Sequence, residues 1–399
     1  MSLMTVKLWR DARATWPRLA MMVVAIAVSL TVFGGVLFAW SAIHRETEIA
    51  YLGTEPASAT IVFGPGVEAD EMAAIAGQAQ TRPGVLEAAG RTQFTSNIEV
   101  NGTAREISLQ VFAAAPGDPM RMATFEVQQG SWPPAPGEIF IRRDSLSLLD
   151  AAVGDSITVT TPGGKALLLK VAGVVYDPSL APAEQQQTAQ GYLSTASLAA
   201  VGEPDVFNQL KLQIADPGAM TPSRDRDAIV ATAGAVAQWL QQEQGLAIRE
   251  IQAPTPYAHP HQGQADALLT ALLIGAGMAL LLATILVANM LNGLFTQQIP
   301  QIGIMKAIGA RSRRIGRLYL TMTLLVAGAA TLLALAPAIW IGRTLAPFVF
   351  GFLGIQAGSV AAAWWTYLVL LAGGLALPVL MTLVPLVKAS RITVRAAID

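Results

Sequence analysis

Four stretches of this 399-residue sequence contain no charged side chain and are long enough to cross a bilayer as helices: Leu19–Trp40, Ala267–Phe295, Leu318–Ile341 and Trp364–Val387. A hydrocarbon core of about 30 Å needs about 20 apolar residues in a helix. Charged residues make up only 13% of the chain, whereas a soluble domain carries about 25%. The sequence therefore predicts a membrane protein with four transmembrane helices.

The charged residues are distributed unevenly, and this predicts the orientation of the helices. Residues 44–265 hold 13 Lys/Arg and 24 Asp/Glu, a net charge of −11. The segments 1–18, 296–317 and 388–399 together hold 12 Lys/Arg and two acids, a net charge of +10. Because cytoplasmic flanks of membrane helices are enriched in Lys and Arg, we expect these three segments on the cytoplasmic side and residues 44–265 outside.

The predicted organisation alternates membrane spans with connecting segments. A cytoplasmic amphipathic segment (1–18) precedes the first span (19–40), and an extracytoplasmic domain (41–265) follows it. Next come the second span (266–295), a cytoplasmic segment (296–317), the third span (318–341), a short external loop (342–363), the fourth span (364–387) and a cytoplasmic tail (388–399). Gly34, Gly35, Gly275 and Gly277 are small enough to let helices approach closely, within or between subunits.

The extracytoplasmic domain has the pattern of a mixed α/β fold with two subdomains. Strand, helix and strand patterns occur both near its start, in Ala59–Phe63 and Glu68–Gln80, and near its end, from Phe207 to Ile251. The middle, about 112–192, is rich in strand patterns. Asn101-Gly102 is a strong hairpin-turn signal, and a second hairpin is expected about Pro162-Gly163-Gly164.

The sequence lacks the signatures of an enzyme. It has no cysteine and three histidines, and it contains neither a phosphate-binding loop nor a metalloprotease or serine-hydrolase motif. His259-Pro260-His261 could hold a metal, but the solvated-linker interpretation is favoured because no acid or thiol is near. The run Gln185–Gln187 is interpreted as a mobile loop. We expect a non-catalytic chain with no cofactor of its own, and nothing indicates nucleic-acid binding.

The segment between the second and third spans is different, because a short apolar helix is expected there on the cytoplasmic side. Pro300 suits the first helical position and Gly309 the residue after the helix. Two to three turns are too short to be stable in water alone, so the helix needs either a partner or the membrane surface to cover it. Its apolar face is expected to consist of Ile302, Met305 and Ile308, which are spaced three apart.

At these residues the chain resembles the MacB/FtsX-like family of ABC transporter permeases. The family signature E-I-G-I-x-K-A-x-G-A matches residues 301–310, with Gln301 in place of Glu. The tail 388–397, the P-x-x-P-G-E of 133–138 and the run 153–159 resemble further family segments. By this resemblance the segment that couples to the ATPase consists of Pro300, Gln301, Ile302, Gly303, Ile304, Met305, Lys306, Ala307, Ile308 and Gly309.

The resemblance implies a function and partners. The chain would be the permease subunit of an ABC transporter in the bacterial inner membrane, and a separate ABC ATPase subunit would bind ATP and Mg. It would form a dimer with a second copy or a paralogue, and a periplasmic adaptor and an outer-membrane duct are further possible partners. ATP hydrolysis would move the extracytoplasmic domain and drive export or extraction of a peptide, drug or lipoprotein. The alternative is an FtsX-like transducer that regulates a cell-wall hydrolase without transporting a substrate.

Overall fold

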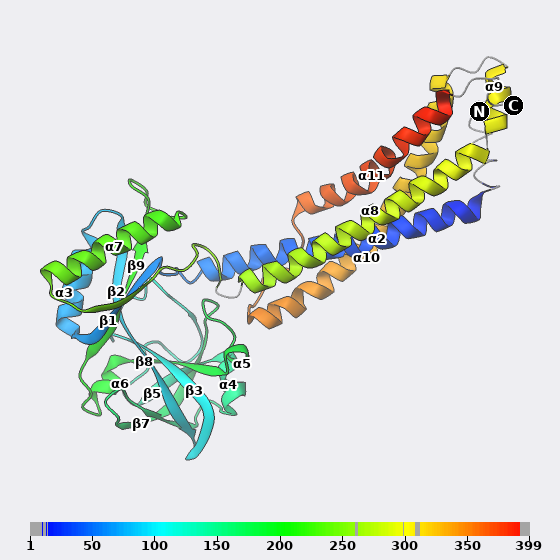
Figure 1. Cartoon of the computed structure of the whole chain (residues 1–399). Helices are drawn as coiled ribbons and strands as arrows, with labels where there is room; N and C mark the ends of the chain where they lie inside the picture. The colour runs from blue at the N-terminus through cyan, green and yellow to red at the C-terminus, as the bar shows by residue number, and fades with distance from the viewer. Residues whose placement is uncertain are drawn as a thin grey trace. The chain divides into compact units, whose positions relative to one another are not determined.

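The computed structural model describes residues 10, 13, 15–259, 262–297, 299–307 and 312–391. These residues form two compact units (Figure 1). The helical unit contains the described residues of 1–46, 264–350 and 357–399, and the α/β unit contains those of 47–263 and 351–356. Most of the predicted amphipathic segment 1–18 and the tail residues 392–399 lie outside the described residues.

Four long helices carry the four predicted apolar stretches. They are α2 (Trp16–Leu52), α8 (Gln262–Gln297), α10 (Ser312–Leu353) and α11 (Trp364–Arg391). All four are long and apolar enough to cross a membrane, and the α/β unit is inserted between the first and the second. The predicted fold class is therefore confirmed. A short helix, α9 (Ile299–Ala307), lies between α8 and α10 in the sequence.

The predicted external loop 342–363 differs from the structure. Helix α10 continues to Leu353 through Pro337 and Pro347, so about half of the expected loop is helical. Arg343 interrupts the apolar run without breaking the helix, because Arg is a good helix former. The helix ends where Gly354 takes the left-handed backbone conformation, with φ at +68°, which is a common helix terminus.

The helical unit is held together by one apolar core and by close approaches at small residues. Buried side chains of all four long helices form the core, among them Leu30, Leu291, Tyr319 and Leu370. Of the glycines predicted to allow close approach, Gly34 and Gly35 do so within this chain: a methyl group on Gly35 would lie 2.5 Å from Ile341 Cγ2. A methyl group on Gly275 would meet no described atom within 4 Å, and on Gly277 only Phe33, at 3.8 Å.

A buried carboxylate near the end of α2 fixes the loop that precedes α11. Glu46 is 8% exposed, and its Oε2 accepts hydrogen bonds from the backbone N–H groups of Gly358 and Ser359 at 2.8 and 3.1 Å. Its Oε1 accepts from Arg45 at 3.0 Å. Charge-assisted hydrogen bonds of this kind are among the stronger ones, so α2 and this loop are expected to move together.

One half of the α/β unit is a sheet covered by two helices on one face (Figure 1). Its strands are β10 (Ile248–Gln252), β1 (Ala59–Glu68), β9 (Val206–Ile214) and the first part of β2 (Val85–Val100), in that order. We call it sheet A. Helices α3 (Ala69–Gln80) and α7 (Arg226–Glu243) pack on it through a buried apolar cluster that contains Leu210, Leu212 and Ile214.

The other half is a closed six-stranded barrel. Pairing runs from β2 to β3 (Thr103–Ala114), β8 (Thr188–Ser194), β5 (Glu138–Arg142), β7 (Ala166–Tyr176), β6 (Ser156–Thr160) and back to β2. Its interior is apolar, and Leu109, Val111, Ile157 and Val159 are fully buried in it. Strand β4 (Glu126–Gln129) extends it beside β7, and α4 (Arg143–Leu149), α5 (Ala183–Gln186) and α6 (Thr195–Ala199) complete this half.

The local predictions for this unit have mixed outcomes. The hairpin at Asn101-Gly102 is confirmed, with both residues at positive φ, and so is the hairpin between β6 and β7. Two strands expected at 90–97 and 98–101 are instead parts of β2, which has a register shift between Ser96 and Ile98.

The glutamine run was expected to be a loop, but it falls largely in a short helix. Helix α5 covers Ala183–Gln186, and Gln187 follows it with φ at +50°. The first N–H of this helix, at Ala183, donates to Asp144 Oδ2 at 2.9 Å. The capping group comes from 39 residues earlier, so no local signal in the sequence announces the helix.

Two adjacent glycines of α11 test the packing of the helical unit. A methyl group on Gly374 would collide with Thr331 Oγ1, whereas one on Gly373 would meet no described atom within 4 Å. Overpacking costs about 1–3 kcal/mol. We expect Gly374→Leu to lower the thermal midpoint of the detergent-solubilised chain, followed by tryptophan fluorescence. Gly373→Leu is the matched control, and equal midpoints for the two variants would contradict this packing.

Candidate functional site

The predicted coupling segment is a helix that follows α8 almost directly. Helix α8 ends at Gln297 and α9 covers Ile299–Ala307. At this end, Arg18 of α2 donates to Gln297 Oε1 at 3.0 Å. The expected helix, Pro300–Ile308, therefore agrees with α9 to within one residue at each end. Ile308 and Gly309 lie outside the described residues.

The described side chains of α9 are mostly exposed. Ile304 is 59% exposed, and Pro300, Gln301 and Ala307 are also exposed, whereas Gly303 is buried. The side chains of Ile302, Met305 and Lys306 are outside the described part of the structure. The predicted apolar face thus stays a prediction, but Ile304 adds an exposed apolar side chain to this short helix.

A buried arginine lies where several segments of the barrel half meet. Arg142, the last residue of β5, is 2% exposed. Its guanidinium donates to the backbone carbonyls of Ala181 and Leu180 at 2.5 and 3.1 Å and pairs with Asp144 Oδ1 at 3.2 Å. A planar guanidinium can serve several acceptors at once, so one side chain joins β5, α4 and the loop after β7.

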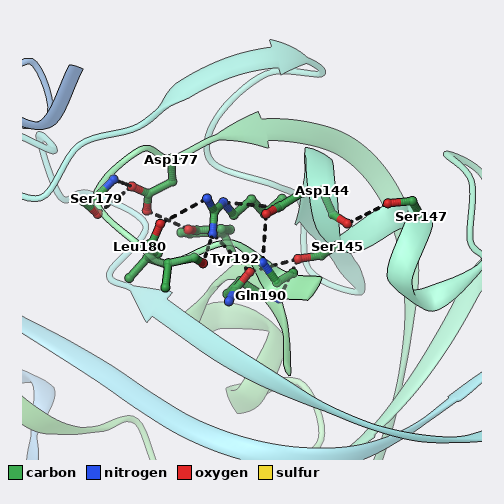
Figure 2. Close-up of polar contacts among 11 residues, drawn as sticks. Asp144, Ser145, Ser147, Asp177, Ser179, Leu180, Gln190 and Tyr192 are labelled. Atoms are coloured by element: carbon green, nitrogen blue, oxygen red, sulfur yellow. Dashed lines mark hydrogen bonds and ion pairs between the residues drawn. The ribbon is translucent and has the colours of Figure 1, made fainter. Parts of the chain in front are cut away.

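Figure 2 also shows a set of polar contacts around Asp177, which lies in the loop after β7. Its Oδ1 accepts from the backbone N–H of Ser179 at 2.9 Å and from the Ser179 hydroxyl at 2.5 Å. Its Oδ2 accepts from the Tyr192 hydroxyl at 2.7 Å. Burial, and then the neighbouring Asp177 carboxylate, raises the pKa of Tyr192 well above its ordinary value. Tyr192 is therefore a neutral hydrogen-bond donor at physiological pH.

Asp177 and Tyr192 line a cavity of about 50 Å³ together with residues of sheet A. Strand β9 contributes Lys211 and β2 contributes Arg91. Side chains alternate between the two faces of a strand, and Leu210 and Leu212 face the helices α3 and α7. Lys211 therefore lies on the face away from the helices. Burial, and secondly the charge of Arg91, lowers the pKa of Lys211 from 10.5 to about 8.

The structure corrects the predicted environment of His259. His259 was expected in a solvated linker, but it is 2% exposed and its ring lies edge-on to Tyr51, with 6.2 Å between centroids. Pro260 and His261 are outside the described residues. Among the described residues no group of three or more His, Cys, Asp or Glu side chains could hold a metal.

Comparison with known proteins identifies the helical part. Residues 273–394 match the family described as FtsX-like permease C-terminal. This part of the chain is similar to the C-terminal part of FtsX-like permeases. The match begins within α8, includes α9, α10 and α11, and ends at residue 394, so it includes the whole predicted coupling segment. No curated protein sequence matches this chain significantly.

Two of the solved structures that are similar to this chain are described as a periplasmic region and an extracellular domain. The periplasmic region of MacB from Actinobacillus actinomycetemcomitans covers 53% of this chain and 92% of its own, with 10% identity and a TM-score of 0.32. The extracellular domain of the noncanonic ABC-type transporter YknZ from Gram-positive bacteria covers 48% and 100%, with 13% identity and a TM-score of 0.30. A domain of a putative permease from Porphyromonas gingivalis covers 48% and 77%, with 15% identity and a TM-score of 0.26.

Sequence reasoning did not single out Arg142, Asp177 or Lys211. Arg142 begins the charged run Arg142-Arg143-Asp144 at the end of a strand, and Asp177 is an isolated charge directly after a strand. A solvent-facing role is the ordinary expectation for both. Lys211 alternates with apolar residues in the strand Val206–Ile214, a pattern typical of a half-exposed strand. The usable signal in each case would have been a contact between distant parts of the sequence.

Removing the guanidinium of Arg142 should destabilise the α/β unit. Arg142→Met would leave two buried carbonyl groups and Asp144 without their cation, and breaking a buried pair in this way costs about 3–5 kcal/mol. The urea midpoint of the full chain, followed by tryptophan fluorescence, should fall accordingly. Arg121→Met is the control, because Arg121 is 71% exposed and 3.9 Å from Glu87, and such exposed pairs contribute about 0–1 kcal/mol. Similar midpoints for both variants would contradict this role of Arg142.

Proposed function

We propose that this FtsX-like permease couples ATP hydrolysis by a separate ABC ATPase subunit to movement of its α/β unit. The movement drives export or extraction of a peptide, drug or lipoprotein from the periplasm or the membrane. ATP and Mg are bound by the ATPase, and this chain acts as its non-catalytic partner. It works as a dimer with a second copy or a paralogue in the bacterial inner membrane.

The observation that carries this proposal is the position of α9 in the chain. Helix α8 begins at Gln262, in the last residues of the segment 47–263 of the α/β unit, and ends at Gln297, two residues before α9 begins. One continuous helix thus connects the α/β unit with the coupling segment. A helix of 36 residues is about 54 Å long, enough to cross the bilayer and to extend beyond it.

The charge pattern supports the placing of α9 and both termini in the cytoplasm. Lys306 and Arg311 lie between α8 and α10 in the sequence, and Arg313 lies in the first turn of α10, whereas the α/β unit is acidic. Basic segments stay on the cytoplasmic side. An exposed apolar side chain such as Ile304 on a short helix is the kind of surface that a protein groove can cover.

Photo-cross-linking from Ile304 tests the partner. In cells that express the permease with a photo-cross-linking amino acid at position 304, we expect covalent capture of an ABC ATPase, identified by mass spectrometry. Leu168 of β7 is the matched control, because it is 65% exposed and belongs to the α/β unit. Capture of the ATPase from position 168, or only lipid adducts from position 304, would contradict the proposal. The second result would mean that α9 lies on the membrane surface.

A charge substitution in α9 tests coupling itself. We expect Met305→Asp to abolish stimulation of ATP hydrolysis by the permease, measured with the ATPase complex purified from native membranes. Thr296→Asp is the control, since it places the same charge on the exposed end of α8. Unchanged stimulation in Met305→Asp would argue against coupling through this helix. Recovery of a cell-wall hydrolase in the complex, with no effect on drug or peptide tolerance, would favour the transducer alternative.

A further inference from the structure

The cavity between sheet A and the barrel has walls of two kinds. Aromatic side chains from the barrel half form the apolar wall: Phe112, Phe125 and Trp132, beside Tyr192. Charged side chains, Arg91, Lys211 and Asp177, form the polar wall. All of these residues belong to the α/β unit. Such a mixture of apolar walls with a few fixed polar groups is typical of small-molecule sites.

Most of the polar groups in this cavity already have partners. Both oxygens of Asp177 accept hydrogen bonds, from Ser179 and from Tyr192. Arg91 pairs with Asp118, and it donates to the backbone carbonyls of Gly90 and Met122 at 3.0 and 3.3 Å. The internal contacts of the fold therefore account for these two charges.

Lys211 is the exception. Among the residues that the structure describes, its ammonium group has neither a hydrogen-bond partner nor an ion-pair partner within 4.0 Å, although it lines the cavity. The side chain is partly buried. An ammonium group has three donors, and leaving a partly buried charge unpaired is unfavourable. A ligand that supplies a hydrogen-bond acceptor and a negative charge would give the Lys211 ammonium group the partner that it lacks.

The size of the cavity and its walls restrict the ligand. One water molecule needs about 10–15 Å³ of cavity volume, so a cavity of about 50 Å³ has room for about four water-sized groups. A carboxylate with a methyl or methylene group has this size. Its oxygens would accept from Lys211, and its alkyl part would contact the aromatic wall. A phosphate or sulfate dianion suits the site less, because several donors are needed to replace its hydration.

We propose that this cavity binds the carboxylate group of a small monocarboxylate or of a peptide C-terminus, with Lys211 as its ion-pair partner. The site is separate from α9 and does not depend on coupling to an ATPase. It gives the α/β unit a ligand of its own, bound where sheet A meets the barrel.

The proposal predicts how binding depends on pH. Three other ionisable groups line the cavity with Lys211: Arg91, Asp177 and Tyr192. Arg91 is paired with Asp118, and Asp177 accepts a hydrogen bond from Tyr192. Lys211 has a pKa of about 8 without ligand, so it is charged below pH 8 and loses its proton above. Only the charged form attracts a carboxylate. Affinity should therefore be nearly constant from about pH 6, where the ligand carboxylate is ionised, to about pH 7, and fall about tenfold per pH unit above the pKa of about 8.

The experiment measures binding of ¹³C-labelled propionate to the full chain in nanodiscs by NMR line broadening. Lys211→Met should weaken binding by about tenfold or more at pH 7. Lys211→Arg should retain binding but lose the decrease above pH 8, because arginine stays charged. Lys170→Met is the control, since Lys170 is an exposed lysine on β7. A thermal midpoint for each variant establishes that it is folded.

The outcomes separate the two sources of the carboxylate. If N-acetyl-dialanine binds with a free C-terminus but not as the amide, the site takes peptide C-termini. If only propionate binds, it takes small free acids. Absence of binding by both compounds, wild-type affinity in Lys211→Met, or an affinity unchanged between pH 7 and pH 9.5 would overturn the proposal.

Discussion

The absence of hydrogen-bond partners in lipid determines the architecture of the helical unit. Every backbone N–H and C=O group inside a bilayer must be satisfied within the protein, and a helix does this with its own residues. Four helices result, and water cannot drive them together, so they associate by close packing. The consequence is visible at Gly34, Gly35 and Gly374, where another helix occupies the space that a side chain would need. The apolar core of the helical unit is built around these approaches.

The parts of the fold that could be predicted are those with a local physical cause. Apolar length indicates the spans, and Asn101-Gly102 marks a turn that requires two positive φ angles. Helix α7 begins where the Asp225 side chain accepts from the N–H groups of Asp227 and Ala228, which is an ordinary helix-start signal. For α9, the prediction relied on Pro300 at the first helical position and on Gly309 after the last, and the structure has a helix at Ile299–Ala307.

The parts that could not be predicted depend on contacts between distant residues. Strand β8 has no alternating pattern, because six of its seven residues are buried, and its parallel partner β3 lies about 80 residues earlier. Helix α5 depends on a cap from Asp144. The candidate cavity is a similar case. From its sequence pattern Lys211 is an outward-facing lysine, whereas in the structure it lines a cavity together with residues of the barrel half. Local periodicity carries none of this information.

Strand β2 is a member of both halves of the α/β unit. Its residues Val85 to Arg91 pair with β9 of sheet A, and Thr92 to Val100 pair with β3 of the barrel. The change of partner falls between Arg91 and Thr92, and Arg91 also lines the cavity. Because one strand is hydrogen-bonded in both halves, the halves cannot separate without breaking its pairing with β9 or with β3. A molecule bound in the cavity would therefore contact both halves beside the strand that joins them.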